Sequence, residues 1–485
     1  MAIAGGIALL TLAAAASARY AAHTAGSGRK PGAAPATEFA TVSKLMNDAI
    51  AAQRLPGGVV VIGHGGRIVF HRAYGSRKIA SEPGLDGSPA RAEPMTEDTI
   101  FDIASLTKCL ATATAVMQLY EHGKVAFDDP VQKYLPDFNT GNDPLRAKVT
   151  VRMLLTHTSG EPDDVNLHDP WGLGAADKAE GIHRALTTPL QSPPGEVFRY
   201  SDINYILLGA LIEKLTGEPE DVYVQQNVFA PLGMQETRYL PPAKACGPHV
   251  MRGVAIAWAP APKGRMRVAC PAGTWSTSLL SRIAPTAIDD QSNADPGKNP
   301  DFDFLLRGTV HDPTARRMGG VAGHAGVFST AHDVSLYAQA LLDRLADRPS
   351  KFPLKQATLE LMTTPQQPGH TVGQVEAAND AAREAIAKTP NTYDPLLAPL
   401  YPAIKGQNLF GFGWDIDTDY SKPRGLIFPI GSFGATGFTG TSLWLDPGSD
   451  TYVILLANSI HQPGSPPISS LRGDVATAAA QALGL

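Results

Sequence analysis

Strand-forming segments stand at both ends of this 485-residue chain, and a mainly helical stretch separates them. Near the start, two apolar runs between Gly58 and Tyr74 flank a His64-Gly65-Gly66 turn, which is typical of a β-hairpin. Near the end, further strand-like segments span residues 410–417, 441–447 and 451–458. We therefore expect strands from both ends of the chain to share one antiparallel sheet.

Helical patterns fill the middle of the chain and also close it. The segment Glu38–Ala52 is amphipathic, residues 105 to about 245 are mainly helical with loops, and a last helix is expected at 469–483. The helical run that starts at Tyr205 ends on Gly217, a good C-cap. This layout predicts an α+β fold, in which an antiparallel sheet is flanked by helices and an inserted, mainly helical lobe faces the sheet across the active site.

The length suits one large catalytic unit, residues 37–485, after a separate N-terminal segment, residues 1–36. Within this unit we expect a sheet lobe at about 37–100 and 317–485 and a helical lobe at about 101–316. Residues 246–316 and 363–408 are proline-rich or polar and are expected to be peripheral insertions, the second with a helix at Gln374–Ala387.

The first eighteen residues form an apolar run that ends in Ala16-Ser17-Ala18, a small-residue pattern suited to signal-peptidase cleavage. This favours export to the periplasm or outside the cell. Because no basic residues precede the run, an uncleaved membrane anchor remains the alternative. The net charge of −5 offers nucleic acid no electrostatic partner, so the expected partner is a small-molecule or peptide substrate.

The octapeptide Phe101–Lys108, FDIASLTK, places Ser105 one helical turn before Lys108. A serine hydroxyl is a poor nucleophile at neutral pH, and a neighbouring amine can accept its proton or hold it beside a second base. The pattern by itself is common, since any helix with serine and lysine can produce it. Its meaning depends on the rest of the chain.

Five segments in one order give the chain a recognisable likeness. They are TIFDIASLTK around Ser105, LLTHTSG at 154–160, FRYSDINYILLG at 198–209, GGVAGHAGVFST at 319–330 and ATGFTGTSLWLDP at 435–447. Over roughly residues 38–483 the sequence resembles the serine β-lactamase and penicillin-binding protein superfamily. It is most similar to the class C β-lactamase-related branch, which includes envelope esterases and D-alanyl-D-alanine carboxypeptidases.

The resemblance implies a role for three residues. Ser105 would be the acylated nucleophile, Lys108 the amine that keeps its proton mobile, and Tyr200 the family tyrosine that relays protons to and from Ser105. A nearby Lys108 ammonium favours the phenolate, so we expect it to lower the pKa of Tyr200. The alternative is that Tyr200 is a packing aromatic between the lobes.

Two motifs depart from the family pattern. The family motif Y-x-N is Tyr200-Ser201-Asp202 here, so a carboxylate that only accepts hydrogen bonds replaces an amide that also donates them. Asp202 can still pair with Lys108, but while ionised it cannot donate to a substrate carbonyl. Asn204 could supply an amide instead, although its place on a helix should point it elsewhere.

The third family motif, Lys or His followed by Thr or Ser and Gly, is Ala435-Thr436-Gly437 here. The cation that helps to hold a substrate carboxylate is missing, a loss of about 1.5–3 kcal/mol of charge-assisted contact. Thr436 keeps a hydroxyl, and Gly437 would let the substrate backbone approach. The resemblance implies an oxyanion hole formed by the N–H groups of Ser105 and Phe438.

The remaining histidines and cysteines indicate little chemistry. His324 and His157 are expected to shape loops rather than to act as bases. Cys246 and Cys270 could pair in an oxidising compartment, whereas Cys109 should pack inside its helix. No tight ligand motif appears in the sequence, so neither a metal nor another cofactor is expected.

Two classes of function stay open. The favoured one is a serine hydrolase that forms an acyl-enzyme on Ser105 from an ester or amide, with esterase-like action preferred because of Ala435. A D-alanyl-D-alanine carboxypeptidase or a β-lactamase is the alternative within this class. The competing class is a penicillin-binding or cell-wall sensor protein that does not turn over.

Overall fold

The structure is a computed structural model that describes residues 39–485, apart from 258–268, 290–295, 389–401, 462–463 and 465–466. The segment 1–36, for which a signal-like run and a linker are predicted, lies outside the described residues. No helix of the described residues is long and apolar enough to cross a membrane.

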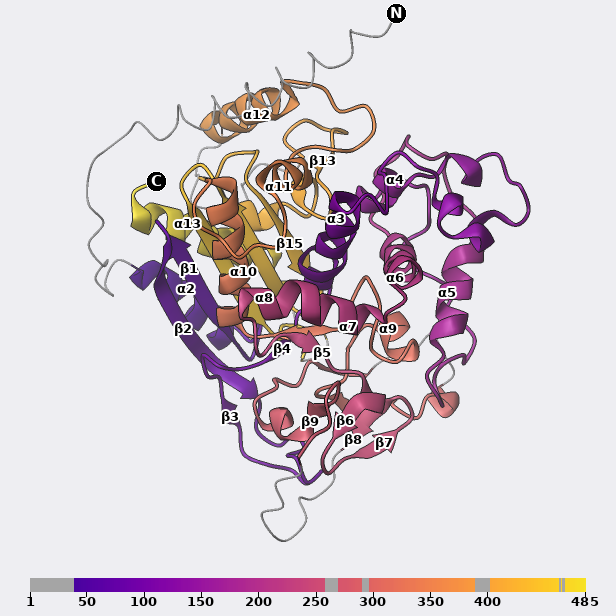
Figure 1. The fold of residues 1–485 in the computed structure, drawn as a ribbon. Coiled ribbons are helices and arrows are strands. Elements are labelled where there is room, and N and C mark those ends of the chain that lie inside the picture. The colour runs from indigo at the N-terminus through magenta and orange to yellow at the C-terminus, as the bar shows by residue number, and fades with distance from the viewer. Residues whose placement is uncertain (1–38, 258–268, 290–295, 389–401, 462–463, 465–466) are drawn as a thin grey trace, which may run out of the picture.

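An eight-stranded antiparallel sheet forms the centre of the molecule (Figure 1). Its order is β13-β14-β15-β16-β17-β1-β2-β3, so the C-terminal strands join the N-terminal hairpin through the pairing of β17 with β1. This confirms the expected sheet shared by both chain ends. The strands are β1 (Gly57–His64), β2 (Arg67–Lys78), β3 (Glu93–Pro94), β13 (Leu409–Phe410), β14 (Asp415–Asp417), β15 (Phe433–Gly437), β16 (Thr441–Asp446) and β17 (Thr451–Ala457).

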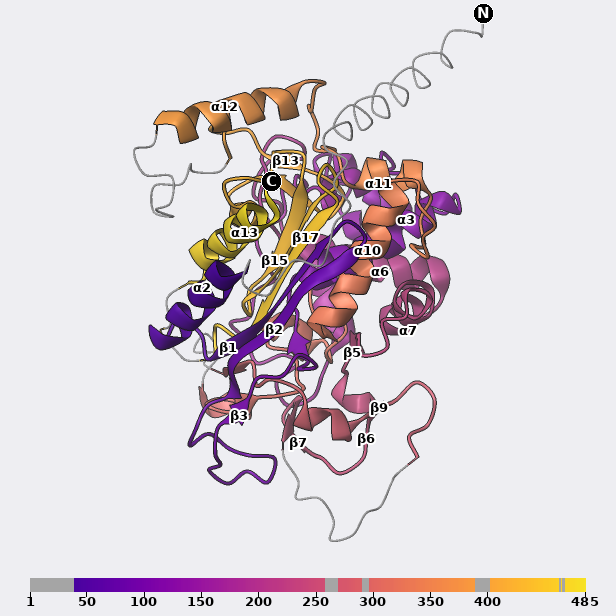
Figure 2. The same cartoon turned by 90° about the vertical axis from the view of Figure 1, so that its left-hand side faces the viewer.

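Both faces of this sheet are covered, which explains why β1 is a continuous apolar run rather than an alternating one. Val60 and Ile62 pack into one core with α2 (Ala40–Ala51) and α13 (Ser469–Leu483). Val59 and Val61 point to the opposite face, which α10 (Ala331–Leu345) covers. Figure 2 shows α2 and α13 on one side of the sheet and α10 on the other.

The remaining helices lie mostly beside α10, beyond that second face (Figures 1 and 2). α6 begins after a Ser201 N-cap and ends at Gly217, a left-handed residue with φ 75°, as the sequence predicts. The helices are α3 (Thr114–Glu121), α4 (Val151–Leu155), α5 (Lys178–Thr187), α6 (Asp202–Thr216), α7 (Glu220–Val224), α8 (Ala230–Leu232), α9 (Pro313–Arg317), α11 (Gln356–Met362) and α12 (Gln374–Lys388). The α+β prediction is confirmed.

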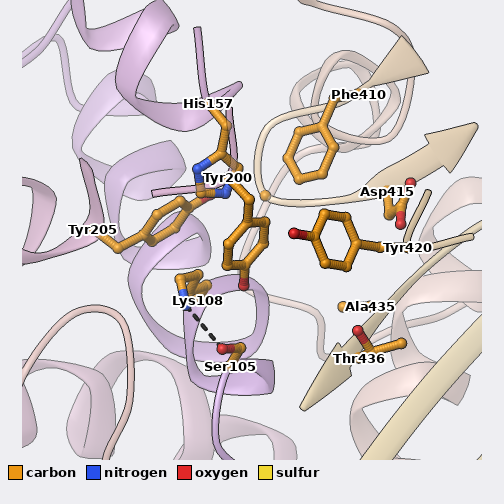
Figure 3. Close-up of a pocket in the computed structure, with 11 residues that line it drawn as sticks. Ser105, Lys108, His157, Tyr200, Tyr205, Phe410, Asp415, Tyr420, Ala435 and Thr436 are labelled. Carbon is orange, nitrogen blue, oxygen red and sulfur yellow. Dashed lines mark hydrogen bonds between the residues drawn. The ribbon is translucent and has the colours of Figure 1, made fainter. Parts of the chain in front are cut away.

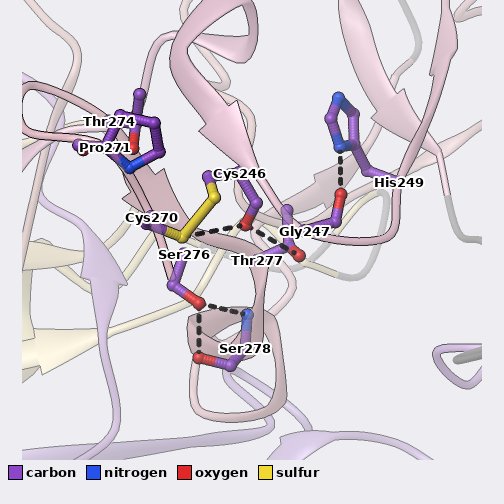
Figure 4. Close-up of a disulfide and its surroundings, with 9 residues drawn as sticks. All are labelled: Cys246, Gly247, His249, Cys270, Pro271, Thr274, Ser276, Thr277 and Ser278. Carbon is purple, nitrogen blue, oxygen red and sulfur yellow. Dashed lines mark hydrogen bonds between the residues drawn. A yellow bond between two sulfur atoms is a disulfide. The ribbon is translucent and has the colours of Figure 1, made fainter. Parts of the chain in front are cut away.

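Short strands outside the main sheet hold the loops together. β12 (Val327–Ser329) pairs with β4 (Phe101–Asp102) on one side and with β5 (Arg238–Tyr239) on the other. The pairs β6 (Ala245–Cys246) with β9 (Trp275–Ser276), β7 (Val250–Arg252) with β8 (Ala255–Ala257), and β10 (Ala287–Ile288) with β11 (Leu305–Leu306) lie in the proline-rich insertion. Cys246 and Cys270 form a disulfide there (Figure 4), so these two cysteines do pair.

Candidate active site

The turn that carries Ser105 is fixed from both sides. Asp102, at the end of β4, accepts the N–H of Ala104 at 2.9 Å and the N–H of His311 at 2.8 Å. Ala104 adopts a φ of +47°, a left-handed conformation that a residue with a Cβ rarely takes. The buried Asp102 carboxylate therefore holds a strained turn directly before the candidate nucleophile. No motif in the sequence pointed to this role of Asp102.

The helix that follows Ser105 is not regular at its start. Residues Lys108–Ala113 form a π-helical segment, and the α-helical hydrogen bonds of α3 begin only at Thr114. Lys108 still lies one turn from the serine, as its spacing predicts, and its Nζ donates to Ser105 Oγ at 2.9 Å (Figure 3). Such wide turns inside helices are frequent at functional sites.

The Lys108 ammonium is almost fully buried among oxygen atoms. Its Nζ lies 2.7 Å from Asp202 Oδ1 and donates to the His324 carbonyl at 3.2 Å, and its side chain hydrogen-bonds with Tyr200. Burial alone would favour the neutral amine, but the charges and hydrogen bonds of Asp202 and Tyr200 outweigh it and hold the pKa of Lys108 well above its ordinary value. Lys108 is an ammonium at neutral pH.

Tyr200 reaches the same centre, because its hydroxyl hydrogen-bonds with Ser105 and Lys108. The expected lowering of its pKa is wrong. Burial raises the pKa of Tyr200, the Lys108 ammonium lowers it by less, and the Asp202 carboxylate adds to the rise. The resting side chain is therefore a neutral phenol that can donate a proton.

His157 supports Tyr200 from behind. Its buried ring accepts the backbone N–H of Ser201 at 3.1 Å on Nδ1 and stacks on the Tyr200 ring. Burial and the Lys108 charge push the pKa of His157 well below its usual range, so the imidazole is neutral. It shapes the loop, as predicted, and Asn204 points at His157 and Ser159 rather than into the cleft.

The opposite wall of the cleft is β15. Ala435 and Thr436 line the cleft with Ser105, as the motif predicts (Figure 3). The Gly437 backbone faces the nucleophile turn, because a Cβ there would come within 2.5 Å of the Ile103 carbonyl. Close packing of protein on protein thus explains this glycine, a different reason from the substrate approach expected above.

The turn after β15 is tied to the nucleophile segment. Thr439 Oγ1 donates to the Asp102 carbonyl at 2.7 Å, and Thr441 Oγ1 donates to the Ile103 carbonyl at 3.0 Å. Phe438 lies on this turn between Gly437 and Thr439; the residue is 72% exposed, and its ring stacks on His311. This bracing couples the position of the Phe438 backbone to that of Ser105.

Aromatic side chains that the sequence analysis did not assign complete the cleft. Tyr420 packs on Tyr200 with ring centroids 4.9 Å apart, and Phe410 lies beside His157. Both come from loops or short strands far along the chain, so no local signal marks them. The cleft residues are Ser105, Lys108, His157, Tyr200, Tyr205, Phe410, Gly413, Asp415, Tyr420, Ala435 and Thr436.

Behind Lys108, the side chains of Asp202, Asp312 and His324 place a donor atom each within 4.8 Å of one another. Such a group has metal-ligand chemistry, but its members already have partners. Asp202 pairs with Lys108, and Asp312 accepts a 2.8 Å bond from His324 Nε2, so a divalent ion would compete with a buried ammonium. The group is best described as an ion-pair network.

Comparison with known proteins agrees with this geometry. The sequence model described as Beta-lactamase matches residues 41–472. The chain belongs to the Beta-lactamase family. This confirms the resemblance drawn from the five motifs, and the protein is a serine hydrolase of that family.

Among its relatives is a protein of Escherichia coli (strain K12) named "Putative D-alanyl-D-alanine carboxypeptidase", 28% identical over 83% of this chain and 78% of the relative. Another is the "N-acetylmuramyl-L-alanine amidase" of Bacillus subtilis (strain 168), 30% identical over 87% of this chain and 81% of the relative. A solved simvastatin synthase mutant from Aspergillus terreus has a TM-score of 0.59 at 21% identity, covering 93% and 96% of the two chains, and supports the fold.

Proposed function

We propose that the protein hydrolyses esters, and more slowly amides, through an acyl-enzyme on Ser105. Attack by Ser105 Oγ on the substrate carbonyl would place the oxyanion between the N–H groups of Ser105 and Phe438. The neutral Tyr200 phenol would protonate the leaving group, and water would then release the acyl group by the same steps in reverse order.

The preferred substrates are neutral close to the scissile bond. The observation that carries this proposal is Ala435, which lines the cleft at the position where the family motif, Lys or His followed by Thr or Ser and Gly, has its cation. Among the described residues that line the cleft, Lys108 is the cation, and its hydrogen bonds are directed to protein oxygens. A carboxylate in this cleft would lose its water without gaining a charge-assisted partner.

A peptidase acting on cell-wall peptides is the second candidate. The names of the relatives from Escherichia coli and Bacillus subtilis favour it, since both denote enzymes that cleave amide bonds next to alanine. The aromatic cleft does not distinguish an ester from an amide. The two candidates differ in the carboxylate, which a D-alanyl-D-alanine terminus carries and a simple ester lacks.

Substrate selectivity tests the proposal. The purified protein is assayed with p-nitrophenyl esters, nitrocefin and a D-Ala-D-Ala-terminated peptide, before and after Ala435→His. We expect the wild type to prefer the esters and the variant to gain about 10-fold or more in relative activity on the carboxylate substrates. Ala52→His, on the exposed end of α2, is the matched control. Equal selectivity of wild type and Ala435→His would refute the role of Ala435.

Trapping with a fluorophosphonate separates the hydrolase from a non-turning-over sensor. A stable adduct located on Ser105 by mass spectrometry, together with burst and steady-state release from esters, is expected. A burst without steady-state release would favour the sensor. The absence of an adduct on Ser105 would contradict both the hydrolase and the sensor.

We also propose that the protein works outside the cytoplasm, in the periplasm or as a secreted enzyme. The Cys246–Cys270 disulfide supports this, because such bonds persist mainly in oxidising compartments. Cell fractionation with detection of the N-terminus of the mature chain tests it. Recovery of reduced protein in the cytoplasm would contradict it.

A further inference from the structure

The Lys108 amine lies between two oxygen atoms, one on a proton donor and one on a proton acceptor. Its Nζ lies 2.9 Å from Ser105 Oγ, which must lose a proton for acylation, and 2.7 Å from Asp202 Oδ1, which can gain one. The Lys108 side chain is 4% exposed and the Asp202 side chain 23% exposed, so this path is largely shielded from water. In the family motif Y-x-N the third position, which Asp202 occupies here, is an amide, whose carbonyl can hold the lysine but cannot take its proton.

The other groups around Ser105 are poorly suited to take its proton unaided. Lys108 keeps its own proton because its pKa lies well above the ordinary value, and burial leaves Tyr200 as a phenol. At neutral pH both side chains are already protonated, so neither can accept a further proton. The Asp202 carboxylate is in contact with Lys108. Lys108 can therefore pass one of its own protons to Asp202 as it takes the proton of Ser105.

We propose that Asp202 is the terminal acceptor of the serine proton, reached through Lys108 in a two-proton relay; this rests on the proposed acyl-enzyme function. As the Ser105 Oγ–H bond breaks and Oγ bonds to the acyl carbon, Lys108 Nζ gives up one of its protons and takes the serine proton in its place, so that the nitrogen never carries more than three. Lys108 releases a different proton to Asp202 Oδ1, and the carbonyl electron pair moves to the oxyanion.

Collapse of the intermediate reverses the relay. The leaving group breaks away with a proton from the Tyr200 hydroxyl, Lys108 returns a proton to Tyr200, and Asp202 returns one to Lys108. The serine proton has then been transferred in net to the leaving group, and every side chain has its starting charge. The same relay takes a proton from water during deacylation.

Asp202 lies among several ionisable groups. It is the first residue of α6, so its carboxylate lies at a helix N-terminus. Other acidic side chains lie nearby. Burial and the charges of Asp202 and Asp312 raise the pKa of Asp164 to about 7, which favours retention of a proton among these acids. The ionisable groups that face Asp202 are Lys108, Asp164, Tyr200, Asp312, His324 and Tyr420.

Asp202→Asn tests the relay, because the amide keeps an oxygen for Lys108 and removes the acceptor. The acylation rate with a p-nitrophenyl ester is followed by stopped flow from about pH 5 to pH 10, a range that covers the ordinary pKa values of the groups involved. We expect a loss of about 100-fold at neutral pH. The remaining rate should climb on the alkaline side, because Lys108 without its carboxylate loses its proton more easily. Asp202→Glu should recover part of the loss.

A proton inventory in mixtures of H₂O and D₂O gives a readout that needs no variant. The wild-type acylation rate should depend on deuterium fraction with a curved, two-proton profile, and Asp202→Asn should give a straight line. Asp163→Asn, which removes an exposed carboxylate from the residue whose backbone carbonyl accepts the Asp202 N–H, is the control and should leave both profiles unchanged.

Three outcomes are informative. A linear wild-type inventory, or an Asp202→Asn rate within about 3-fold of wild type with the same pH profile, would overturn the relay and leave Asp202 a purely structural partner of Lys108. Failure of the wild type to form a Ser105 adduct with a fluorophosphonate would overturn the acyl-enzyme function itself. An adduct on Ser105 combined with an unchanged Asp202→Asn profile would refute only the relay.

Discussion

The imidazole of His157 stacks on the phenol ring of Tyr200, with ring centroids 4.4 Å apart and an angle of 23° between the planes. His157 itself holds a left-handed φ of 56°, and its Nδ1 accepts the N–H of Ser201, the residue after Tyr200. One buried side chain thus fixes both the ring and the backbone of the segment that carries Tyr200, the proposed proton donor. A histidine that does no proton transfer can therefore still determine the rate.

Replacing His157 with alanine should lower both stability and rate. The Ser201 N–H would lose its buried acceptor, which costs about 1–3 kcal/mol of unfolding free energy. Tyr200 would lose its stacking partner, and a misplaced proton donor can reduce kcat/KM about 100-fold. Urea unfolding and ester hydrolysis measure the two effects. His183→Ala on the exposed face of α5 is the control, and equal behaviour of the two variants would contradict this role.

Replacing Tyr200 with phenylalanine should leave the fold intact and remove activity. The ring would still pack on His157 and under Lys108, whose Nζ lies 4.8 Å from its centroid, so only the hydroxyl is lost. We expect kcat to fall about 100-fold or more, the size of a lost general acid. Tyr420→Phe removes a hydroxyl from the same cleft and should change kcat by less than about 3-fold. Similar losses in both variants would argue against a proton-transfer role specific to Tyr200.

Stability should fall as the pH rises toward 8, in part because of Glu161. Its carboxyl is fully buried, and burial raises its pKa from 4.5 to about 8 against the lowering effect of Arg146. Between these two values the folded protein keeps the proton and the unfolded chain releases it, so each rise in pH favours unfolding. The stabilisation is complete below about pH 4.5 and is lost by about pH 8.

Glu161→Gln should remove this pH dependence. The amide is neutral at every pH, and Arg146 keeps its bonds to the carbonyls of Phe138, Leu186 and Thr188. We expect a gain of about 1–3 kcal/mol in unfolding free energy near pH 8 and little change near pH 4. Thermal unfolding across this range checks it, with the exposed Glu196→Gln as control. A variant whose unfolding free energy follows the wild-type pH curve would show that Glu161 is already ionised.

Removal of the disulfide should weaken the insertion without affecting catalysis. Cys246 and Cys270 are 24 positions apart, so their bond restricts the unfolded chain by about 2–4 kcal/mol. Neither residue lines the cleft. Cys246→Ser with Cys270→Ser should therefore lower Tm, leave kcat/KM unchanged, and abolish the effect of added reductant on Tm. A Tm of the wild type that does not respond to reductant would indicate that the bond is absent in solution.

The sequence patterns predicted the sheet because burial leaves a direct mark on them. The runs at 58–64 and 441–458 are apolar where both faces of a strand are covered, and they became β1, β16 and β17. The Gly217 cap and the helix expected at 374–387, observed as α12 (Gln374–Lys388), were predicted for equally local reasons, a left-handed C-cap and helical periodicity.

The prediction for Tyr200 failed because it considered one neighbour at a time. The motif showed that Lys108 would be near, and a nearby ammonium does lower the pKa of a phenol. It did not show how deeply the cleft would bury the ring, or that Asp202 would add its negative charge. Burial depends on every element that packs around a residue, and no short pattern in the sequence records it.

By itself the sequence determined the fold class, the family and the residue types at the reacting centre, because these follow from periodicity and from short motifs. Only the tertiary structure decided the proton states and the supports of that centre. Lys108 meets the carbonyl of His324 across 216 positions, and the turn that carries Phe438 is tied to Asp102 across 337. Contacts between residues so far apart in the sequence arise from packing. Packing sets the local dielectric and the nearby charges that each side chain experiences.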